Sequence, residues 1–298
     1  MAGGEFTVIP PRFDYVRPAT VDDAVLALSD MDNVGEVKVL AGGQSLLPVL
    51  RLRLGAPALV VDLGRTAGVR GVREDGDSLV IGAMTTHYQV LTAPLVRRHC
   101  PLLAEATGTV ADPAVRHRGT LGGALAHADP AGDLGAVARA CDTTMVIAGP
   151  RGRRTVPAAE FFHSYLETAI QPDELLVETR WPKLAPQWGY RYEKANRVAQ
   201  SWAIVAAAAL VRRDGGSIAE ARIGLTNMGA TPLRATVAED ALAGRPVSDD
   251  GVTPATNHAA DGTAPPADLD GQPDYRAHLA RVLTRRAVLT AAMRTGRV

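Results

Sequence analysis

Two glycine-rich loops carry the residue types best suited to holding a phosphate group. The first is Ala41-Gly-Gly-Gln-Ser45, and the second is Arg118-Gly-Thr-Leu-Gly-Gly123. Paired glycines let a backbone approach a ligand closely, and the hydroxyls of Ser45 and Thr120 are suited to phosphate oxygens. Neither loop has the GxxxxGK pattern of a P-loop or the GxGxxG dinucleotide pattern. An anion cradle and a pair of simple tight turns are therefore about equally favoured by these loops alone.

The histidines and cysteines are too scattered to predict a metal site. His87, His117 and His127 lie in different segments without HxxxH spacing, which favours solvent-facing or hydrogen-bonded loop histidines over ligands. The only two cysteines are Cys100 and Cys141, and they form no CxxC motif. We therefore predict neither a cysteine-ligated zinc nor an iron–sulfur cluster on this chain.

Composition excludes several classes of function. The 298 residues include 32 Lys or Arg and 32 Asp or Glu, so the net charge is zero and general nucleic-acid binding is disfavoured. No stretch approaches the roughly 18 apolar residues of a membrane span, and no secretory signal is visible. We expect a reduced, cytoplasmic protein of two domains, because the chain exceeds the length that one core usually supports.

The elements that must hold the loops are predicted from apolar spacing. Apolar residues at helical spacing after the N-cap Thr20 predict a short helix, and residues 37–40 and 58–63 read as strands. Segment 109–132 is too rich in Gly and Pro to be regular throughout. The sequence further predicts a helix over 136–141, a hairpin around Gly149-Pro-Arg-Gly152 and a strand over 174–181.

The second half of the chain predicts a smaller unit of sheet and helices. A linker is expected over 182–187, followed by strands over 189–194, 203–213 and 217–227 and helices over 231–243 and 275–294. Alanines at 203–210 also favour helix by propensity, so that strand competes with a helix. The polar, Pro-rich stretch 245–273 is expected to connect the two helices. The predicted fold class is α+β.

Motifs along almost the whole chain resemble those of one family. They are Ala41-Gly-Gly-Gln-Ser-Leu-Leu-Pro48, the stretch from Val110 to Asp133, Asp173-Glu-Leu-Leu-Val-Glu178, Tyr192-Glu-Lys194, Ile223-Gly-Leu-Thr-Asn-Met-Gly229 and the stretch from Asp274 to Ala287. In this order they resemble the flavin subunit of the molybdenum hydroxylases, the relatives of xanthine dehydrogenase and carbon monoxide dehydrogenase. The resemblance implies a two-lobed, PCMH-type FAD-binding domain over residues 1–182, with lobes of about 1–62 and 63–182. It also implies a C-terminal domain over 187–298 with an antiparallel sheet and helices.

The resemblance implies non-covalent FAD between the two lobes, with both glycine loops holding its pyrophosphate. Carried over residue by residue, the two cradles are Leu40, Ala41, Gly42, Gly43, Gln44, Ser45 and Leu46, and Thr120, Leu121, Gly122, Gly123 and Ala124. Asp133 is implied to reach ribityl or ribose hydroxyls, and Leu176 to line the ring edge. Tyr192 is implied to lie beside the isoalloxazine, with Lys194 as a nearby cation that favours the reduced, anionic flavin. No catalytic or metal-binding residue is implied.

Two positions inform the expected mode of binding. The second loop of the family commonly continues Gly-Gly-Asn or Gly-Gly-Asp, whereas this chain has Ala124 and so lacks a side-chain hydrogen bond there. Related oxidases that attach FAD covalently carry a histidine in a similar first loop. Gln44 cannot form that bond, which is why non-covalent FAD is expected.

The implied function is an electron-transfer subunit of a molybdenum-containing hydroxylase. A large partner would hold the molybdopterin cofactor and a small partner two [2Fe–2S] clusters, in a dimer of heterotrimers. FAD would pass electrons to NAD, a quinone or dioxygen. The alternatives are a self-contained flavin oxidase and a flavin-carrying scaffold without turnover of its own.

The last predicted helix carries many arginines. After Asp274 there is no acidic residue, and the apolar positions of this helix are expected to face a core. The arginines are Arg276, Arg281, Arg285, Arg286, Arg294 and Arg297. A solvated basic face is slightly favoured over a docking surface for an acidic partner.

Overall fold

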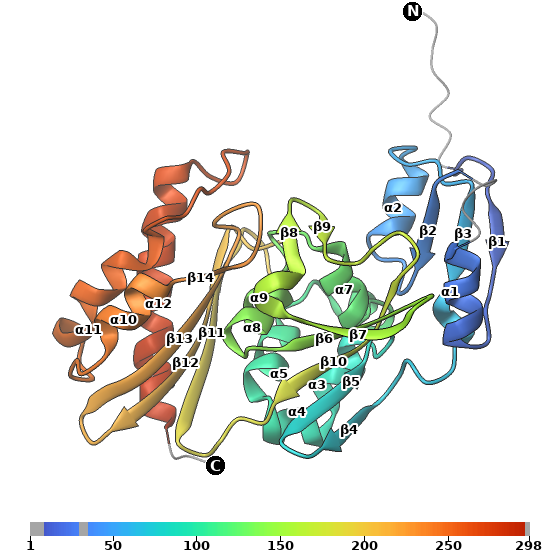
Figure 1. The fold of residues 1–298 in the computed structure, drawn as a ribbon. Coiled ribbons are helices and arrows are strands. Elements are labelled where there is room, and N and C mark those ends of the chain that lie inside the picture. Colours follow the sequence, from blue (N-terminus) through green and yellow to red (C-terminus); the bar gives the residue numbers. More distant parts are fainter. Residues whose placement is uncertain (1–8, 30–34, 296–298) are drawn as a thin grey trace, which may run out of the picture.

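Three sheets lie in a row across the molecule, which is described here by a computed structural model covering residues 9–29 and 35–295 (Figure 1). A three-stranded sheet forms the N-terminal lobe, a five-stranded sheet lies in the centre, and a four-stranded sheet belongs to the C-terminal domain. A two-stranded sheet completes the central part. The chain is thus α+β, as the sequence predicts.

The N-terminal lobe is a small parallel sheet with a helix on each side. Its strands have the order β1-β3-β2, and both pairings are parallel. Its elements are β1 (Asp14–Val16), α1 (Val21–Ser29), β2 (Val37–Leu40), α2 (Leu46–Arg51), β3 (Leu59–Asp62) and the 3-10 helix η1 (Leu63–Arg65). The predicted N-cap is confirmed, because Thr20 Oγ1 accepts the N–H of Asp23 at 3.1 Å. The first glycine loop connects the carboxyl end of β2 to α2.

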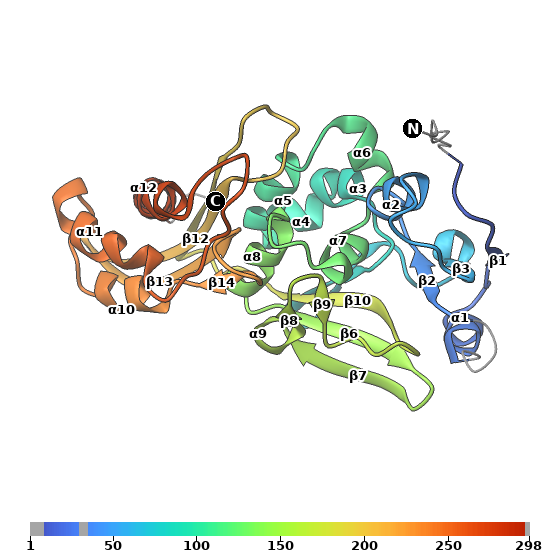
Figure 2. The ribbon, with the colours of Figure 1, turned by 90° about the horizontal axis from the view of Figure 1, so that it is seen from above.

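In the central part, six helices cover one face of an antiparallel sheet of order β4-β5-β10-β6-β7, and the other face packs against the N-terminal lobe (Figures 1 and 2). The helices are α3 (His87–Thr92), α4 (Pro94–His99), α5 (Pro101–Gly108), α6 (Pro113–Arg118), α7 (Leu121–His127) and α8 (Asp133–Ala140). The strands are β4 (Val72–Asp75), β5 (Ser78–Gly82), β6 (Thr144–Gly149), β7 (Gly152–Pro157) and β10 (Leu175–Pro182), with α9 (Ala158–Phe161), β8 (Phe162–Ser164) and β9 (Glu167–Thr168) between β7 and β10. The predicted hairpin is confirmed as β6–β7. Segment 109–132 contains two short helices joined by turns.

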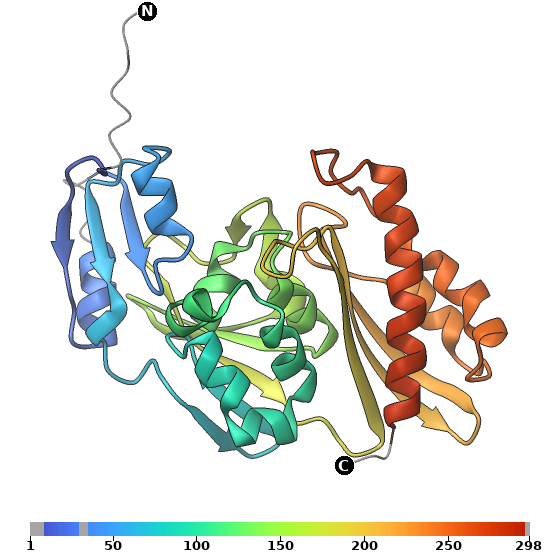
Figure 3. The same ribbon diagram turned by 180° about the vertical axis from the view of Figure 1, so that it is seen from behind.

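The C-terminal domain is an antiparallel sheet of order β11-β12-β13-β14, with its helices on one face (Figure 3). Its elements are β11 (Trp188–Ala195), β12 (Val205–Asp214), β13 (Ser217–Thr226), β14 (Leu233–Arg234), α10 (Thr236–Leu242), α11 (Asp249–Thr256), the 3-10 helix η2 (Asn257–Ala260) and α12 (Pro273–Arg294). The longest of these helices, α12, packs along β11 and β12.

The alanine-rich segment is a strand because both of its faces are covered. Along β12, the side chains of Ala206, Ala208 and Leu210 join the core of the central part. The alternate residues Val205 and Ala207 join a second core with the C-terminal helices. A strand buried on both faces needs small or apolar residues at every position, so tertiary packing overrides the helix propensity of alanine.

Three expectations for the C-terminal part need correction. The helix expected over 231–243 begins only at Thr236, because residues 233–234 pair with β13 as β14. The stretch expected to be a connector contains α11, which Ser248 caps by accepting the N–H of Gly251. Arg276 belongs to no solvated face: it is fully buried, with an ion pair to Asp268. Arg297 lies outside the described residues.

Candidate functional site

The fold brings the two glycine loops into direct contact. A Cβ atom at position 42 would lie 2.3 Å from the carbonyl oxygen of Arg118 and 2.7 Å from the Cα atom of Gly119. A Cβ atom at position 123 would lie 3.2 Å from the Cβ atom of Ala41. Glycine at these positions therefore lets the N-terminal lobe close onto the start of α7. Loops almost 80 residues apart in sequence form one surface.

The first loop offers a row of free backbone donors. Gly43 has φ of +76°, a conformation that favours glycine, and its carbonyl accepts the N–H of Leu47 at the start of α2. Within the described ranges 9–29 and 35–295, no protein group accepts a hydrogen bond from the N–H groups of residues 42–46. Successive N–H groups of this kind form a concave site for an anion. The first loop fits a phosphate.

The second loop has already used the donors that the sequence assigned to a ligand. The N–H of Leu121 binds Thr85 O at 3.0 Å, and the N–H of Gly122 binds Ala83 O at 2.8 Å. The next two N–H groups, of residues 123 and 124, bind the hydroxyl and carbonyl oxygens of Thr120. Gly122 is also packed against the protein itself, since its Cβ would lie 2.4 Å from the Cβ of Ala83. The expected backbone cradle at residues 121–124 is therefore not free. Among the described residues, no acceptor binds the backbone N–H of Thr120, so this N–H and the hydroxyl hydrogen of Thr120 are the donors that remain.

Asp133, Tyr192 and Lys194 form one buried cluster between the central part and the C-terminal domain. The hydroxyl of Tyr192 donates to Asp133 Oδ1 at 2.7 Å, and Lys194 Nζ donates to Asp133 Oδ2 at 2.9 Å. Lys194 Nζ also donates to Thr109 O at 3.1 Å. The side chains of Asp133 and Lys194 are each only 5% exposed. The cluster brings together three predicted site residues from α8 and β11.

Burial dominates the electrostatics of this cluster. Burial raises the pKa of Asp133, although Lys194 and Tyr192 act in the opposite direction by pairing with its carboxylate. Burial and the neighbouring carboxylate raise the pKa of Tyr192 well above its ordinary value. Tyr192 is therefore a neutral donor at physiological pH. Lys194 balances the charge of Asp133, so the pair presents little net charge to its surroundings.

A glutamate that the sequence did not single out lies beside this cluster. Glu105 on α5 accepts the backbone N–H of Tyr192 at 2.8 Å and the guanidinium of Arg294 at 2.6 Å. It also forms a 3.4 Å ion pair with Arg191. Glu105 thus fixes β11 and the end of α12 to the central part. No motif marks it, because its partners lie far away in sequence.

Asn227 holds the turn before Asp133 in place. Its backbone lies in the left-handed region at φ +61°, its N–H donates to Pro130 O at 2.8 Å, and its side chain donates to Ala203 O at 2.9 Å. One residue of the C-terminal domain therefore orients the start of α8. Leu176 on β10 is 5% exposed and belongs to the apolar core that also contains Leu121 of the second loop and Tyr192 of the buried cluster.

The prediction that His87 is a solvent-facing or hydrogen-bonded loop residue is wrong. Its imidazole is 4% exposed beneath the second loop, where a Cβ at position 119 would touch the ring. Nδ1 of His87 is buried without a partner among the described residues, and burial lowers the pKa of His87 to about 4. Within residues 9–29 and 35–295, no group of three or more potential metal ligands occurs, and no helix is long and apolar enough to cross a membrane.

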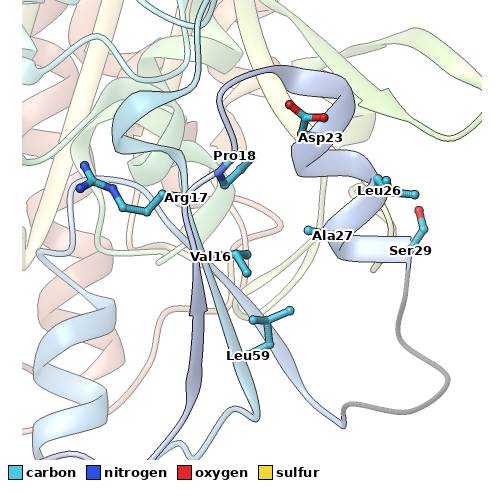
Figure 4. A pocket seen from close by; sticks show the side chains of 8 residues that line it. All are labelled: Val16, Arg17, Pro18, Asp23, Leu26, Ala27, Ser29 and Leu59. Atoms are coloured by element: carbon cyan, nitrogen blue, oxygen red, sulfur yellow. The ribbon is translucent and has the colours of Figure 1, made fainter.

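One groove on the surface is separate from all of these residues. It is a groove of about 740 Å³ on the N-terminal lobe between α1 and β1, lined by Val16, Arg17, Pro18, Asp23, Leu26, Ala27, Ser29 and Leu59 (Figure 4). None of its lining residues belongs to the glycine loops or to the buried cluster.

Family models match two consecutive parts of the chain. Residues 11–184 match the FAD binding domain in molybdopterin dehydrogenase. Residues 190–291 match the CO dehydrogenase flavoprotein C-terminal domain.

Curated proteins and solved structures agree with these matches. The carbon monoxide dehydrogenase medium chain of Hydrogenophaga pseudoflava is 39% identical over 95% of this chain and 98% of that protein. The caffeine dehydrogenase subunit beta of Pseudomonas sp. strain CBB1 is 36% identical over 96% of each. A solved structure of carbon monoxide dehydrogenase from Hydrogenophaga pseudoflava superposes with a TM-score of 0.93 at 41% identity, covering 96% of this chain and 99% of that chain.

Proposed function

Because the chain belongs to the family of FAD-binding medium subunits of molybdenum hydroxylases, we propose that it binds FAD non-covalently at the meeting point of its two glycine loops. The observation that carries this assignment is the row of N–H groups at residues 42–46, which have no acceptor in the described part of the chain and lie against the start of α7. FAD supplies the capacity to accept and release electrons.

The two loops contribute different groups in this proposal. The first loop binds a pyrophosphate oxygen with backbone N–H groups, and the Ser45 hydroxyl can donate a further hydrogen bond. From the second loop we assign the hydroxyl and the backbone N–H of Thr120, because the N–H groups of residues 121–124 already bind protein oxygens. Gly42 and Gly123 allow the two loops to lie in close contact, because a side chain at either position would lie too close to the other loop.

We assign the buried cluster a positioning role. Each oxygen of Asp133 already accepts a hydrogen bond, and the side chain is almost inaccessible. Asp133 then orients Tyr192 and Lys194, and a hydrogen bond to a flavin hydroxyl would use one of its remaining lone pairs. Because Asp133 neutralises Lys194, we expect a smaller effect of this lysine on the flavin potential than a free cation would exert.

We further propose that the chain works in a heterotrimer with a large molybdopterin subunit and a small iron–sulfur subunit, assembled as a dimer of heterotrimers in the cytoplasm. The relatives named above are medium or beta subunits of dehydrogenases, which supports partners of this kind. Free cysteines at positions 100 and 141 fit a reducing compartment. Electrons would leave to NAD, a quinone or dioxygen, and the hydroxylated substrate is selected by the large subunit.

Flavin release and reoxidation test the proposal. The purified chain should be yellow, and acid precipitation should leave intact FAD in the supernatant, because Gln44 cannot link it covalently. Flavin that remains with the precipitated polypeptide would contradict non-covalent binding. After photoreduction, reoxidation by an added acceptor distinguishes an electron-transfer subunit from a scaffold. Oxidation of a substrate by the isolated chain would instead favour a self-contained oxidase.

A further inference from the structure

The two segments that carry the glycine loops contain no carboxylates. The chain has 32 Asp and Glu residues, yet none occurs between Glu36 and Asp62 or between Asp112 and Asp129. Each glycine loop lies inside one of these two segments, and each segment contains arginines. Because the fold brings the loops together, neither segment adds a negative charge to the surface that they form. Such a surface favours a bound anion.

Two of the carboxylates that border these segments are held by other groups. Asp62, at the end of β3, accepts a hydrogen bond from the hydroxyl of Tyr15 and forms a 3.2 Å ion pair with Arg17. Asp112 caps α6, because its carboxylate accepts the N–H of Val115 at 2.9 Å. Both carboxylates therefore have partners outside the glycine loops.

Arg118 places a cation at the point where the two loops meet. Its carbonyl oxygen would lie 2.3 Å from a Cβ atom at position 42, and it precedes Thr120 by two residues. The Arg118 side chain is exposed, and no described residue forms a hydrogen bond or an ion pair with it. Lys194, in contrast, is already paired with Asp133. The long side chain of Arg118 can therefore turn towards an anion bound between the loops.

We propose that the guanidinium of Arg118 supplies the positive charge that pairs with the pyrophosphate of FAD. This inference rests on the proposed function. The N–H groups of the first loop and the two donors of Thr120 are neutral, whereas a pyrophosphate is anionic. Hydrogen bonds between ionised groups are stronger than those between neutral groups, and a guanidinium can bind two phosphate oxygens at once. Arg118 thus acts on the phosphate part of the cofactor and not on its flavin ring.

Arg51 is the competing source of positive charge. It is exposed, and no described residue forms an ion pair with it. Arg51 is the last residue of α2, which follows Ser45, and six residues of helix span about 9 Å. Arg118 instead adjoins the contact between the loops. We therefore assign the charge to Arg118 and use Arg51 to test the assignment.

Titration of the flavin-free full chain with FAD tests this assignment, with quenching of flavin fluorescence as the measure of binding. Arg118→Gln should weaken FAD binding about tenfold at low salt concentration, because it removes a charge-assisted hydrogen bond. The difference from the wild type should shrink at high salt concentration, since salt screens the attraction between charges. Arg118→Lys should keep most of the affinity, because it keeps the charge.

Matched control variants change exposed arginines at the ends of other short helices. Arg98 lies in the last turn of α4, as Arg118 does in α6, and Arg51 ends α2. Arg98→Gln should bind FAD like the wild type, and Arg51→Gln should weaken binding by less than about twofold. A larger effect of Arg51→Gln than of Arg118→Gln would place the charge on α2 and overturn the proposal.

The unfolding midpoint of the flavin-free chain separates a binding role from a structural one. Arg118→Gln should unfold at the wild-type midpoint, because the side chain is exposed and has no described partner. Wild-type affinity of Arg118→Gln for FAD would overturn the proposal. A loss of affinity that neither high salt concentration nor Arg118→Lys reduces would also overturn it, since the residue would then shape the loops. Failure of the wild-type chain to bind FAD would instead refute the proposed function.

Discussion

Individual buried side chains show how this protein places charge. Asp133 and Lys194 lie almost completely out of water and are paired with each other, and Tyr192 shares the same carboxylate. A buried pair contributes modestly when it is intact, but removing one partner leaves an uncompensated charge. The buried imidazole of His87 avoids this problem because it stays neutral.

Lys194→Met should destabilise the protein by about 3–5 kcal/mol at neutral pH, because the Asp133 carboxylate then lacks its cation. Burial already raises the pKa of Asp133, and loss of Lys194 removes the main effect opposing that rise. The native carboxyl then binds a proton more tightly than the unfolded one, so the loss of stability should shrink as pH is lowered through the raised pKa of Asp133. Urea unfolding at several pH values measures this loss of stability. The double variant Asp133→Asn/Lys194→Met should recover part of the loss; no recovery would contradict an energetic coupling of the pair.

His87 should make the protein acid-sensitive. The pKa of His87 is about 4 when folded, against about 6.5 for an ordinary histidine, so the unfolded state binds more protons between these values. Stability is therefore lost as pH falls through that window, by about 2 kcal/mol at pH 5 and about 3 kcal/mol below pH 4. Urea unfolding of His87→Gln should show a correspondingly shallower pH dependence. His278→Gln, at an exposed position, is the control; an unchanged slope in His87→Gln would remove this group as the cause.

Helices, strands and loops pack closely against one another where a glycine leaves room for the neighbouring backbone, as at Gly42, Gly122 and Gly224. Helix α7 packs on the end of β5 because Gly122 has no side chain, and its first N–H groups bind carbonyls of residues 83 and 85. Gly122 therefore allows α7 to pack closely against residue 83, although the sequence of its loop resembles a ligand cradle.

Gly122→Ala should lower stability by about 1–3 kcal/mol, since the new methyl group overlaps Ala83 and α7 must move. FAD affinity should fall with it, because Thr120 moves together with α7. Chemical denaturation and flavin titration measure the two effects. Gly108→Ala is the matched control near the end of α5: its Cβ would have ordinary contact at 3.6 Å, and helix propensity favours it. Wild-type stability in Gly122→Ala would show that the helix tolerates the methyl group.

The central part and the C-terminal domain share one apolar core. One apolar cluster includes Leu103 and Val137 of the central part together with Tyr192, Ala206 and Leu210 of the C-terminal domain. We therefore expect the central part and the C-terminal domain to unfold as one unit.

Gly224→Ala should disturb this shared core. Its Cβ would lie 2.0 Å from Ala136 O on α8, a backbone atom that cannot move alone. We expect a loss of about 3 kcal/mol and, in calorimetry, a split of one unfolding transition into two. Gly216→Ala, in an open turn of the same domain, should unfold like the wild type. A single transition at the wild-type temperature for Gly224→Ala would contradict close packing of β13 against α8 at this position.

The sequence by itself determined the family, the α+β class and most elements, because apolar spacing, turn residues and the order of motifs are local signals. Tertiary structure decided what each residue does. Gly43 leaves its loop open with a positive φ, whereas Gly122 lies in α7 against Ala83. Lys194 is neutralised by a residue 61 positions away, and β12 is a strand because two layers cover it. Hydrogen-bond partners and burial are set by segments distant in the chain, so no local pattern reveals whether a donor remains free for a ligand.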